Sequence, residues 1–496
     1  MATKVYQPQI RVWLWKARSV SPGSTGGDPV DITGYLGDNS TVTVTRSVRD
    51  ASGTFVVRFA DQPNRNFQQT MYRLIEPMDM IIIRMSHDPA KTGGSPDDPL
   101  TPYGGGSNIP LIIRGMVTTI NRNETMTDMG PQRWVTVTGH DQMKILQVFR
   151  INYFYGLNSG MWTEINFKFA HVYAPNMMRK NKNANMFLQD VLDEVINPFI
   201  KTMSDLNKVV DGVPMLKPWL GKFSLPEDDN ICPDTLSRFD DQTLYDVLKS
   251  VLDVGIFNEL YLEEDEKNTY LVARPAPFKD IEGNFIQGTA LSLDIPSKDI
   301  VSIDVGRSDA EACNYFWISL FYDKKYNADQ MAAAIDGKNK GWMTGDWINS
   351  RKELLSWRKM EVGVQMTPFV VTDDDASLKV PFRRHTIDYV QWLCDKRVAL
   401  AEMNKNEMVF EKGTLRLRGN HNIKAGMYLR ILRGPLQIFD GEVYAHTITH
   451  EFNVMNGFFT TIQFDRGTVF SNWYFGTGQK ATWIDEIEAQ SNMPGY

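Results

Sequence analysis

The first 145 or so residues alternate between apolar and polar side chains with the period of two that is typical of β-strands. Thr41–Thr45 alternates strictly between threonine and valine, Asp50–Gly53 supplies a turn, and Thr54–Ala60 returns with aromatic and branched residues on one face. Three more strands are predicted over Met80–Met85, Leu111–Ile120 and Trp134–Thr138. This part of the chain therefore predicts an antiparallel sheet with one covered face.

A long irregular connection separates two of these strands. Residues 87–110 are rich in glycine and proline and include Gly104–Gly106. Connections of this length without regular structure are uncommon inside a domain and usually project toward a partner.

The pattern changes to a helical period between residues 146 and 255. Met186–Met203 carries apolar residues at helical spacing, and Pro198 is expected to kink or interrupt that helix. A second amphipathic helix is predicted over Leu244–Leu252, with Asp241 as its N-cap and Gly255 as its stop. Residues 146–255 are therefore predicted to form a mostly helical insertion.

Strand patterns return at Asn258–Leu262, which is followed by a charged turn and a returning strand, Thr269–Arg274. Further strands are predicted over Leu291–Leu293, Ile300–Val305 and Tyr315–Tyr322. Residues 323–408 break this pattern and include a helix that carries Ile387, Val390, Leu393, Cys394 and Val398. The strands resume at Thr414–Arg418, so the second β region is predicted to be a split barrel.

The segment from Glu411 to Phe470 has the most closely specified turns of the chain. After Gly426–Ile431, the strands Val443–Phe452 and Phe458–Asp465 are predicted to form a long hairpin. Its connection contains Asn456-Gly457, a step that tolerates the positive φ of a tight turn. This segment is expected to complete the barrel that begins near Asn258.

Composition places the 496-residue chain among ordinary globular proteins of two to four domains, with 42% hydrophobic and 23% charged residues. The formal net charge of -7 is mildly acidic, whereas a protein that binds nucleic acid usually has a basic domain or stripe. No apolar run approaches the length of a membrane span, and the N-terminal stretch does not have the pattern of a signal peptide. Cys232, Cys313 and Cys394 lie far apart and are interpreted as small buried hydrophobic residues. We therefore expect a soluble protein made in a reducing compartment.

One cluster has the composition of a metal site, His446 and His450 followed by Glu451. On a helix, two histidines four residues apart would share a face. The β-branched residues between them indicate a strand, where four steps of roughly 3.3 Å separate the side chains by about 13 Å. No metal site is predicted.

Three acidic clusters are the remaining candidates for chemistry: Glu263–Glu266, Glu227–Asp229 and Asp373–Asp375. Solvated turns account for all three, although sequence spacing leaves open a hydrolase built from two distant acids. Gly476–Lys480 imitates part of a phosphate loop, but Ala481 stands where serine or threonine is required. No catalytic, cofactor-binding or metal-binding residue and no cofactor are predicted, and the chain is not expected to be an enzyme.

Four segments carry a resemblance to a known family: Thr41–Asp61, Gly139–Leu146, Asn258–Leu262 leading to Ala273–Phe278, and Val443–Thr468. In order and spacing they resemble the opening and closing segments of the two barrels of baseplate hub proteins of contractile-tailed bacteriophages. The hub half of type VI secretion spike proteins belongs to the same structural group. The resemblance extends over nearly the whole chain.

The resemblance implies a homotrimer whose paired barrels form a ring of six similar domains. Such a hub joins the hexameric tail tube to the trimeric central spike, contacts other baseplate proteins, and lets DNA and the tape measure protein pass without specific binding. It would be part of the virion and would be assembled in the host cytoplasm. Alternatives that remain open are a tail-associated peptidoglycan hydrolase and a hub of a type VI secretion system.

With the resemblance, the predicted fold class is α+β and β-dominated, with two tail-tube-like antiparallel β-barrel domains and mostly helical insertions. The predicted parts are a first barrel (1–145), a helical insertion (146–255), a second split barrel (256–322 with 409–470), an α/β insertion (323–408) and a C-terminal extension (471–496). No spike-like module follows residue 470, so the spike is expected to be another polypeptide. The aromatic extension is expected to dock on that spike or a neighbouring subunit, or to pack on its own barrel.

Overall fold

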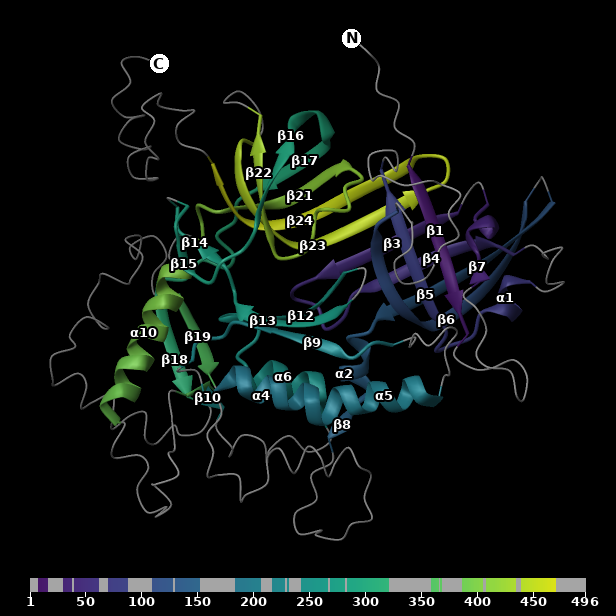
Figure 1. Ribbon diagram of the computed structural model, residues 1–496. Helices are drawn as coiled ribbons and strands as arrows, with labels where there is room; N and C mark the ends of the chain where they lie inside the picture. The colour runs from purple at the N-terminus through teal and green to yellow at the C-terminus, as the bar shows by residue number, and fades with distance from the viewer. Residues whose placement is uncertain are drawn as a thin grey trace, which may run out of the picture.

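The protein is β-dominated, and its main feature is a large, curled, mostly antiparallel sheet (Figure 1). The computed structural model describes residues 8–16, 30–37, 40–61, 70–87, 109–127, 130–151, 183–206, 216–227, 230–231, 242–265, 268–281, 283–320, 358–364, 366–367, 386–404, 407–433 and 439–469. The sheet contains 13 strands from both ends of the chain.

The N-terminal strands of this sheet are β1 (Gln9–Trp15), β2 (Val30–Asp31), β3 (Thr41–Ser47), β4 (Thr54–Ala60), β5 (Met80–Ser86), β6 (Leu111–Thr127) and β7 (Gly130–Asp141). The C-terminal strands are β16 (Ser292–Pro296), β17 (Ile300–Gly306), β21 (Glu411–Arg418), β22 (Met427–Leu432), β23 (Gly441–Asn453) and β24 (Gly457–Val469). We call these sets the N-terminal unit and the C-terminal unit.

The two units have the same strand order. Neighbouring strands run β3-β4-β7-β6-β5-β1 in the N-terminal unit and β17-β21-β24-β23-β22-β16 in the C-terminal unit. Numbered by position in the chain, with the two-residue β2 left aside, both orders read second, third, sixth, fifth, fourth, first. Only the last pairing differs, because β1 and β5 are antiparallel whereas β16 and β22 are parallel. The described strands therefore contain an internal duplication of topology.

The longest hairpin of each unit carries a bulge at the equivalent place. In β6 the register shifts between Val117 and Thr119, and in β23 it shifts between Ala445 and Thr447. Each bulge comes just after the strand stops pairing with β5 or β22. Bulges bend a strand and increase its twist, so both hairpins turn away from their short neighbours at the same point.

An aromatic residue faces a glycine next to each bulge, with the partners exchanged between the units. Phe55 of β4 lies opposite Gly139 of β7, whereas Gly413 of β21 lies opposite Phe464 of β24. Both phenylalanines are buried. A glycine in a strand weakens the sheet unless a neighbouring ring covers it. In both units a phenylalanine ring lies opposite the glycine at the same point of the sheet.

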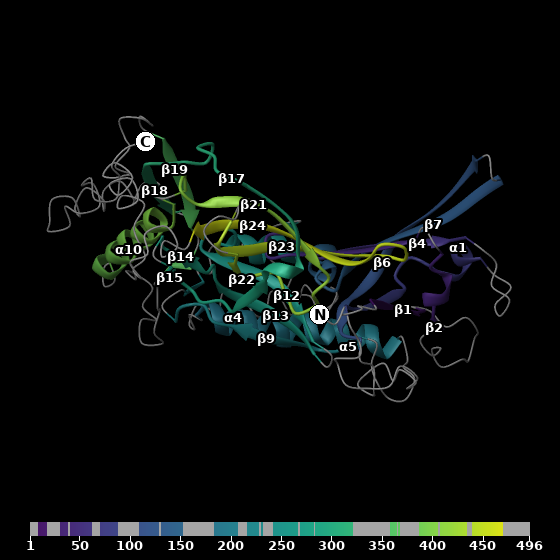
Figure 2. The same cartoon turned by 90° about the horizontal axis from the view of Figure 1, so that it is seen from above.

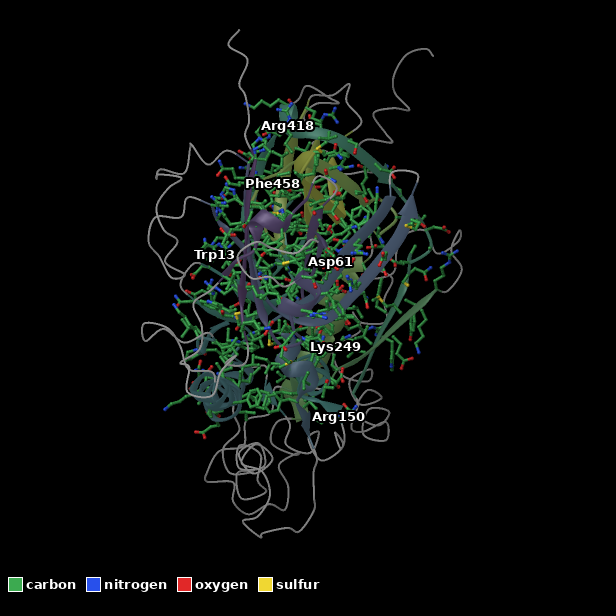
Figure 3. The ribbon with its side chains drawn as sticks, turned by 90° about the vertical axis from the view of Figure 1, so that its right-hand side faces the viewer. Trp13, Asp61, Arg150, Lys249, Arg418 and Phe458 are labelled. Atoms are coloured by element: carbon green, nitrogen blue, oxygen red, sulfur yellow. The ribbon has the colours of Figure 1, made fainter. Side chains whose placement is uncertain are left out.

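A separate layer lies below the large sheet (Figure 1). The hairpin β12 (Asn258–Glu264) and β13 (Thr269–Pro275) is extended by β9 (Trp219–Phe223), which pairs in parallel with β13. Beneath it lie α2 (Lys144–Val148), α4 (Ala184–Val191), α5 (Asn197–Leu206) and α6 (Leu244–Val251). Figure 3 shows the order from the side, with Phe458 of the C-terminal unit above Asp61 of the N-terminal unit and Lys249 of α6 below both.

The hydrophobic cores follow the same division. One core fills the N-terminal unit around Phe55, Val57 and Phe59, and another fills the C-terminal unit around Leu415 and Ile462. A third core packs the helices and the β12–β13 hairpin against β5 and β6. A smaller core joins β18 (Tyr315–Leu320), β19 (Lys359–Val364) and α10 (Thr386–Asn404).

The remaining elements are short. They are η1 (Thr33–Tyr35), α1 (Met71–Leu74), β8 (Arg150–Ile151), β10 (Asn230–Ile231), β11 (Gln242–Thr243), β14 (Phe278–Lys279), β15 (Phe285–Gln287), η6 (Ser297–Asp299) and β20 (Met366–Thr367).

Every strand predicted over residues 41–138 is present, and so is the closing hairpin. The predicted helix over 186–203 is present as α4, a wider π-type turn over Leu192–Ile196, and α5, which carries Pro198 in its first turn.

Two details of the predicted helices are wrong. Thr243, not Asp241, caps α6, because the Thr243 hydroxyl accepts a hydrogen bond from the Asp246 backbone amide at 3.1 Å. The helix also ends at Val251, before Gly255. The strand β9 was not predicted, since Trp219–Phe223 contains a glycine and is exposed along its centre.

Candidate functional site

The site with the most distinctive geometry is the joint where the two units meet. Strand β23 pairs with β22 over its first half and with β3 of the N-terminal unit over its second half, from Thr447–Ser47 to Asn453–Thr41. Hydroxyl pairs line this joint: Thr447 donates to Ser47 at 2.9 Å, and the Thr45 and Thr449 hydroxyls lie 3.1 Å apart. The joint makes one sheet from two units.

A buried ion pair fastens the underlying hairpin to this joint. Arg46, which lies between Thr45 and Ser47 in β3, pairs with Glu264 at the end of β12. The Glu264 side chain is 1% exposed, and its Oε2 also accepts a hydrogen bond from the Arg114 backbone amide of β6 at 3.2 Å. Because a buried carboxylate needs charged or hydrogen-bonding partners, Glu264 ties three strands together.

Asp141, at the end of β7, is a second buried carboxyl beside this pair. It accepts hydrogen bonds from the backbone amides of Gly53 at 2.8 Å and Met143 at 3.0 Å. Burial raises the pKa of Asp141 to about 7, and Glu264 adds to that increase, although Arg46 and the two amides oppose it. A cavity of about 70 Å³ lies between this group, His421 and His450.

The raised pKa of Asp141 predicts a stability that falls as the pH rises. An unfolded aspartate has a pKa near 3.9, so between about pH 4 and pH 7 the native protein holds a proton that the unfolded chain has lost. The free energy of unfolding should fall across this window by up to about 1.4 kcal/mol per pH unit from this group. Asp141→Asn should flatten the slope in chemical denaturation curves measured from pH 4.5 to 8. An unchanged slope would contradict the assignment.

A second buried network joins the same hairpin to the C-terminal unit. Glu259 of β12 accepts a hydrogen bond from Arg274 Nε at 3.0 Å and is paired with the Tyr444 hydroxyl of β23. Arg274 also donates to the Gly426 carbonyl at 2.7 Å. Burial and the nearby Glu259 carboxylate raise the pKa of Tyr444 well above its usual value, so it stays a neutral donor.

Further charged contacts continue this network around β14 and β24. Arg466 donates to the Pro277 carbonyl at 2.9 Å, and its guanidinium lies 3.5 Å from the centre of the Phe278 ring. Lys279 pairs with Glu442 of β23 at 2.6 Å. The β12–β13 hairpin and the strand after it are therefore fixed to both units through buried charges, and this should hold the units at one angle.

Each of the two histidines of β23 has a hydroxyl partner of its own. His446 is half-buried with its Nδ1 2.9 Å from the Thr447 hydroxyl, and His450 is buried with its Nδ1 3.0 Å from the Thr460 hydroxyl. Burial, with Arg46 nearby, lowers the pKa of His450 to about 3, so it remains neutral. Within the described residues, no group of three or more potential ligands is placed to hold a metal ion.

The interpretation of the acidic clusters as solvated turns is wrong for one residue. Glu264 is buried in the joint, whereas its neighbour Glu263 pairs with Lys222 and Lys424, each at 2.9 Å. Glu227 is exposed. The described residues do not include Asp228, Asp229, Asp373–Asp375, Gly476–Lys480, Cys232, the extension after Val469 or most of the 87–110 connection.

Cys313 is half-buried, not fully buried as predicted, and packs at the edge of the core that contains β18 and α10. Burial raises the pKa of its thiol, which keeps the thiol protonated and weakly reactive.

Two of the open strand edges in the described part of the large sheet belong to β6 and β17. Strand β6 pairs with β5 only as far as Met116, so its second half has β7 on one side and no described strand on the other. Strand β17 ends the strand order of the large sheet, with β21 as its one described neighbour. Figure 2 shows the β6–β7 hairpin reaching beyond the rest of the molecule, with β17 set well away from it.

No known family model matches the chain, and no curated protein sequence matches it. Several solved structures do resemble it. These structural neighbours are phage tail and type VI secretion proteins. The 43 kDa tail protein of prophage MuSo2 from Shewanella oneidensis is 12% identical, with a TM-score of 0.43 over 92% of this chain and 98% of that one.

The tail protein from Neisseria meningitidis MC58 is 9% identical, with a TM-score of 0.39 over 92% of this chain and 96% of that one. An Escherichia coli component of the type VI secretion system, described as similar to bacteriophage T4 tail proteins, is 9% identical, with a TM-score of 0.35 over 90% and 77%.

Among the described helices, none is long and apolar enough to cross a bilayer.

Proposed function

We propose that this protein is the structural baseplate hub of a contractile phage tail, a homotrimeric ring between the tail tube and the central spike. The duplicated strand order is the observation that carries this proposal. A chain with two similar units gives three copies six such units, which matches a six-fold tube on one side and a three-fold spike on the other.

The continuous sheet and the buried ion pairs between the units support a mechanical role. A ring that stays closed while a tail contracts needs its units fixed at one angle. The β23–β3 joint supplies a continuous sheet. The buried pairs Arg46–Glu264 and Arg274–Glu259 stabilise the β12–β13 hairpin that lies beneath this joint. Buried charge pairs are strongly directional, so they favour one relative placement of the elements they join.

The polar face of the large sheet is suited to line a passage. Along β3 and β23, the side chains turned away from the cores are Thr43, Thr45, Thr449 and Glu451, all half-buried. The neighbouring strands add Thr136, Thr138 and Thr461 to the same face. The same face carries Arg58 and Arg416, but Arg58 lies over the Trp134 ring, and Arg416 lies over the Phe459 ring and pairs with Glu451. Hydroxyl groups make up the rest of this face, so DNA and the tape measure protein would pass without being held tightly.

The proposal includes the division of the chain made from its sequence. Residues 1–145 and 256–322 with 409–470 would hold the two tube-like barrels, although the β12–β13 hairpin and β18 pair outside the large sheet. Residues 146–255 and 323–408 would form the insertions, and 471–496 would contact a partner. The partners are two further copies, the tube and spike proteins and other baseplate proteins, in a virion assembled in the host cytoplasm.

Mass measurement by light scattering or sedimentation is the first test. We expect the purified protein to form a trimer, alone or once the tube and spike proteins of the same tail are added. A protein that stays monomeric with both partners present would refute the proposal. A cell-wall zymogram provides the enzymatic control: clearing that is lost on substitution of a single Asp or Glu would favour a hydrolase, and the genomic neighbours would separate a phage from a type VI system.

A further inference from the structure

We infer that the open half of β6 pairs with β17 of the next copy, so that the joint between subunits repeats the joint within each subunit. This inference rests on the proposed ring and adds which strands close it and in what register. The duplicated topology of the two units supports this pairing. The N-terminal unit has an open edge at the place where the C-terminal unit receives β3, and β17 is the counterpart of β3.

The two long hairpins show where the open edge begins. In β23, pairing with β22 ends at Ala445 and pairing with β3 begins at Thr447, just past the bulge. In β6, pairing with β5 ends at Met116, the bulge follows, and the strand then continues to Thr127. The stretch Thr119–Thr127 is thus the counterpart of the half of β23 that holds β3.

The bulges and the aromatic–glycine pairs also fix the register. Thr119 and Thr447 are equivalent because each follows its bulge, which makes Arg122 equivalent to His450. Val44 lies opposite Phe55 and Val305 lies opposite Gly413, the two equivalent members of the aromatic–glycine pairs.

Within the chain, His450 lies opposite Val44. Between chains, Arg122 should therefore lie opposite Val305, and Asn123 opposite Asp304. The pairs then run from Asn121 with Gly306 to Thr125 with Ser302, beyond which a bulge at Val301 interrupts the register of β17.

The side chains of both edges fit a joint that is buried only after assembly. Asn121–Met126 are all exposed, and Met126 is 77% exposed at the tip of the hairpin. Opposite them Val301 is 51% exposed, although it lies within a strand. The inferred pairing brings Met126 to the bulge at Val301, where these two exposed apolar side chains would cover each other.

The polar positions are also matched. Thr125 faces Ser302 and Asn123 faces Asp304, which repeats the hydroxyl and amide character of the intramolecular joint. An amide donor beside a carboxylate is a favourable cross-strand pair. The occupant of each edge is thus a second copy of the same chain, since the complementary edge is present on that chain.

Disulfide trapping tests the joint and its register. In the double variant Asn123→Cys/Asp304→Cys, the two positions lie directly opposite each other in an antiparallel pair, within the Cα distance that a disulfide spans. Mild oxidation of the assembled protein should yield a covalent trimer on a non-reducing gel. The matched control is Asn121→Cys/Ser302→Cys, on the same two strands but four residues out of register, about 13 Å apart.

The expected result is cross-linking at least roughly tenfold faster for the first pair than for the control, with none beyond background in the single variants. The single variants also report any contribution from the three native cysteines. A protein that is trimeric by light scattering but gives no Asn123–Asp304 cross-link would overturn the inference and leave the ring proposal standing. Equal rates for both pairs would overturn the register. A protein that is monomeric with tube and spike present would overturn both.

Discussion

Phe55→Ala is expected to lower the free energy of unfolding by about 3–5 kcal/mol, the usual cost of removing a fully buried phenylalanine. The Phe55 ring is completely buried in the core of the N-terminal unit. It also occupies the space that two strand glycines leave open. A Cβ added at Gly139 would lie 2.3 Å from the ring, and one at Gly115 would lie 2.4 Å from it. Without the ring, a cavity and two uncovered glycines remain, and the surrounding backbone cannot collapse to fill it.

Chemical denaturation followed by tryptophan fluorescence measures this change. Val56→Ala is the matched control, because Val56 is the next residue of β4 but points to the other face and is 37% exposed. The control should change stability by no more than about 0.5 kcal/mol. Equal losses in the two variants would show that the strand, and not the ring over the glycines, determines the stability of this unit.

The strands were predictable because they are amphipathic and antiparallel. In β3 and β4, every second side chain enters the core, so the sequence alternates and the burial alternates with it. The closing hairpin was predictable for the same reason, and Gly457 has the positive φ that the turn requires. The local sequence pattern alone was enough to predict the paired strands of residues 41–60 and 443–465.

The repeated strand order could not be read from the sequence, which predicted two barrels but not that their strands follow the same order. Phe55 and Gly139 exchange places with Gly413 and Phe464 in the second unit. Packing between two strands is preserved when a large and a small residue swap sides, but any position-by-position likeness between the units is lost. Fold duplication can therefore persist where sequence repeats are invisible.

The buried charges of the joint were also beyond local reading. Arg46 and Glu264 are 218 residues apart, and Tyr444 and Glu259 are 185 residues apart. Glu264 stands in a run of acidic residues that has the composition of a solvated turn. The one available signal was the arginine that ends the alternating stretch before Ser47, because a long cation within a buried strand requires a partner. Which carboxylate pairs with this arginine depends on the fold.

Arg46→Met is expected to be the most damaging substitution in the joint, at about 3–5 kcal/mol, because it leaves the Glu264 carboxylate buried without its cation. The double variant Arg46→Met/Glu264→Gln should recover most of that loss, since a glutamine can still accept the Arg114 amide hydrogen bond and carries no charge. Arg133→Met is the control: it breaks an exposed pair with Glu124 and should cost less than about 1 kcal/mol.

The same variants separate stability from assembly. Arg46 also lowers the pKa of Asp141, so its removal should let that carboxyl hold its proton to higher pH and extend the window over which stability falls. If the ion pair sets the angle between the units, Arg46→Met should lose the trimer under conditions where the monomer is still folded, and the double variant should regain stability before it regains the trimer. Light scattering beside denaturation curves measures both. A double variant that recovers both together would mean that the continuous β23–β3 sheet sets the angle, and that the ion pair only stabilises it.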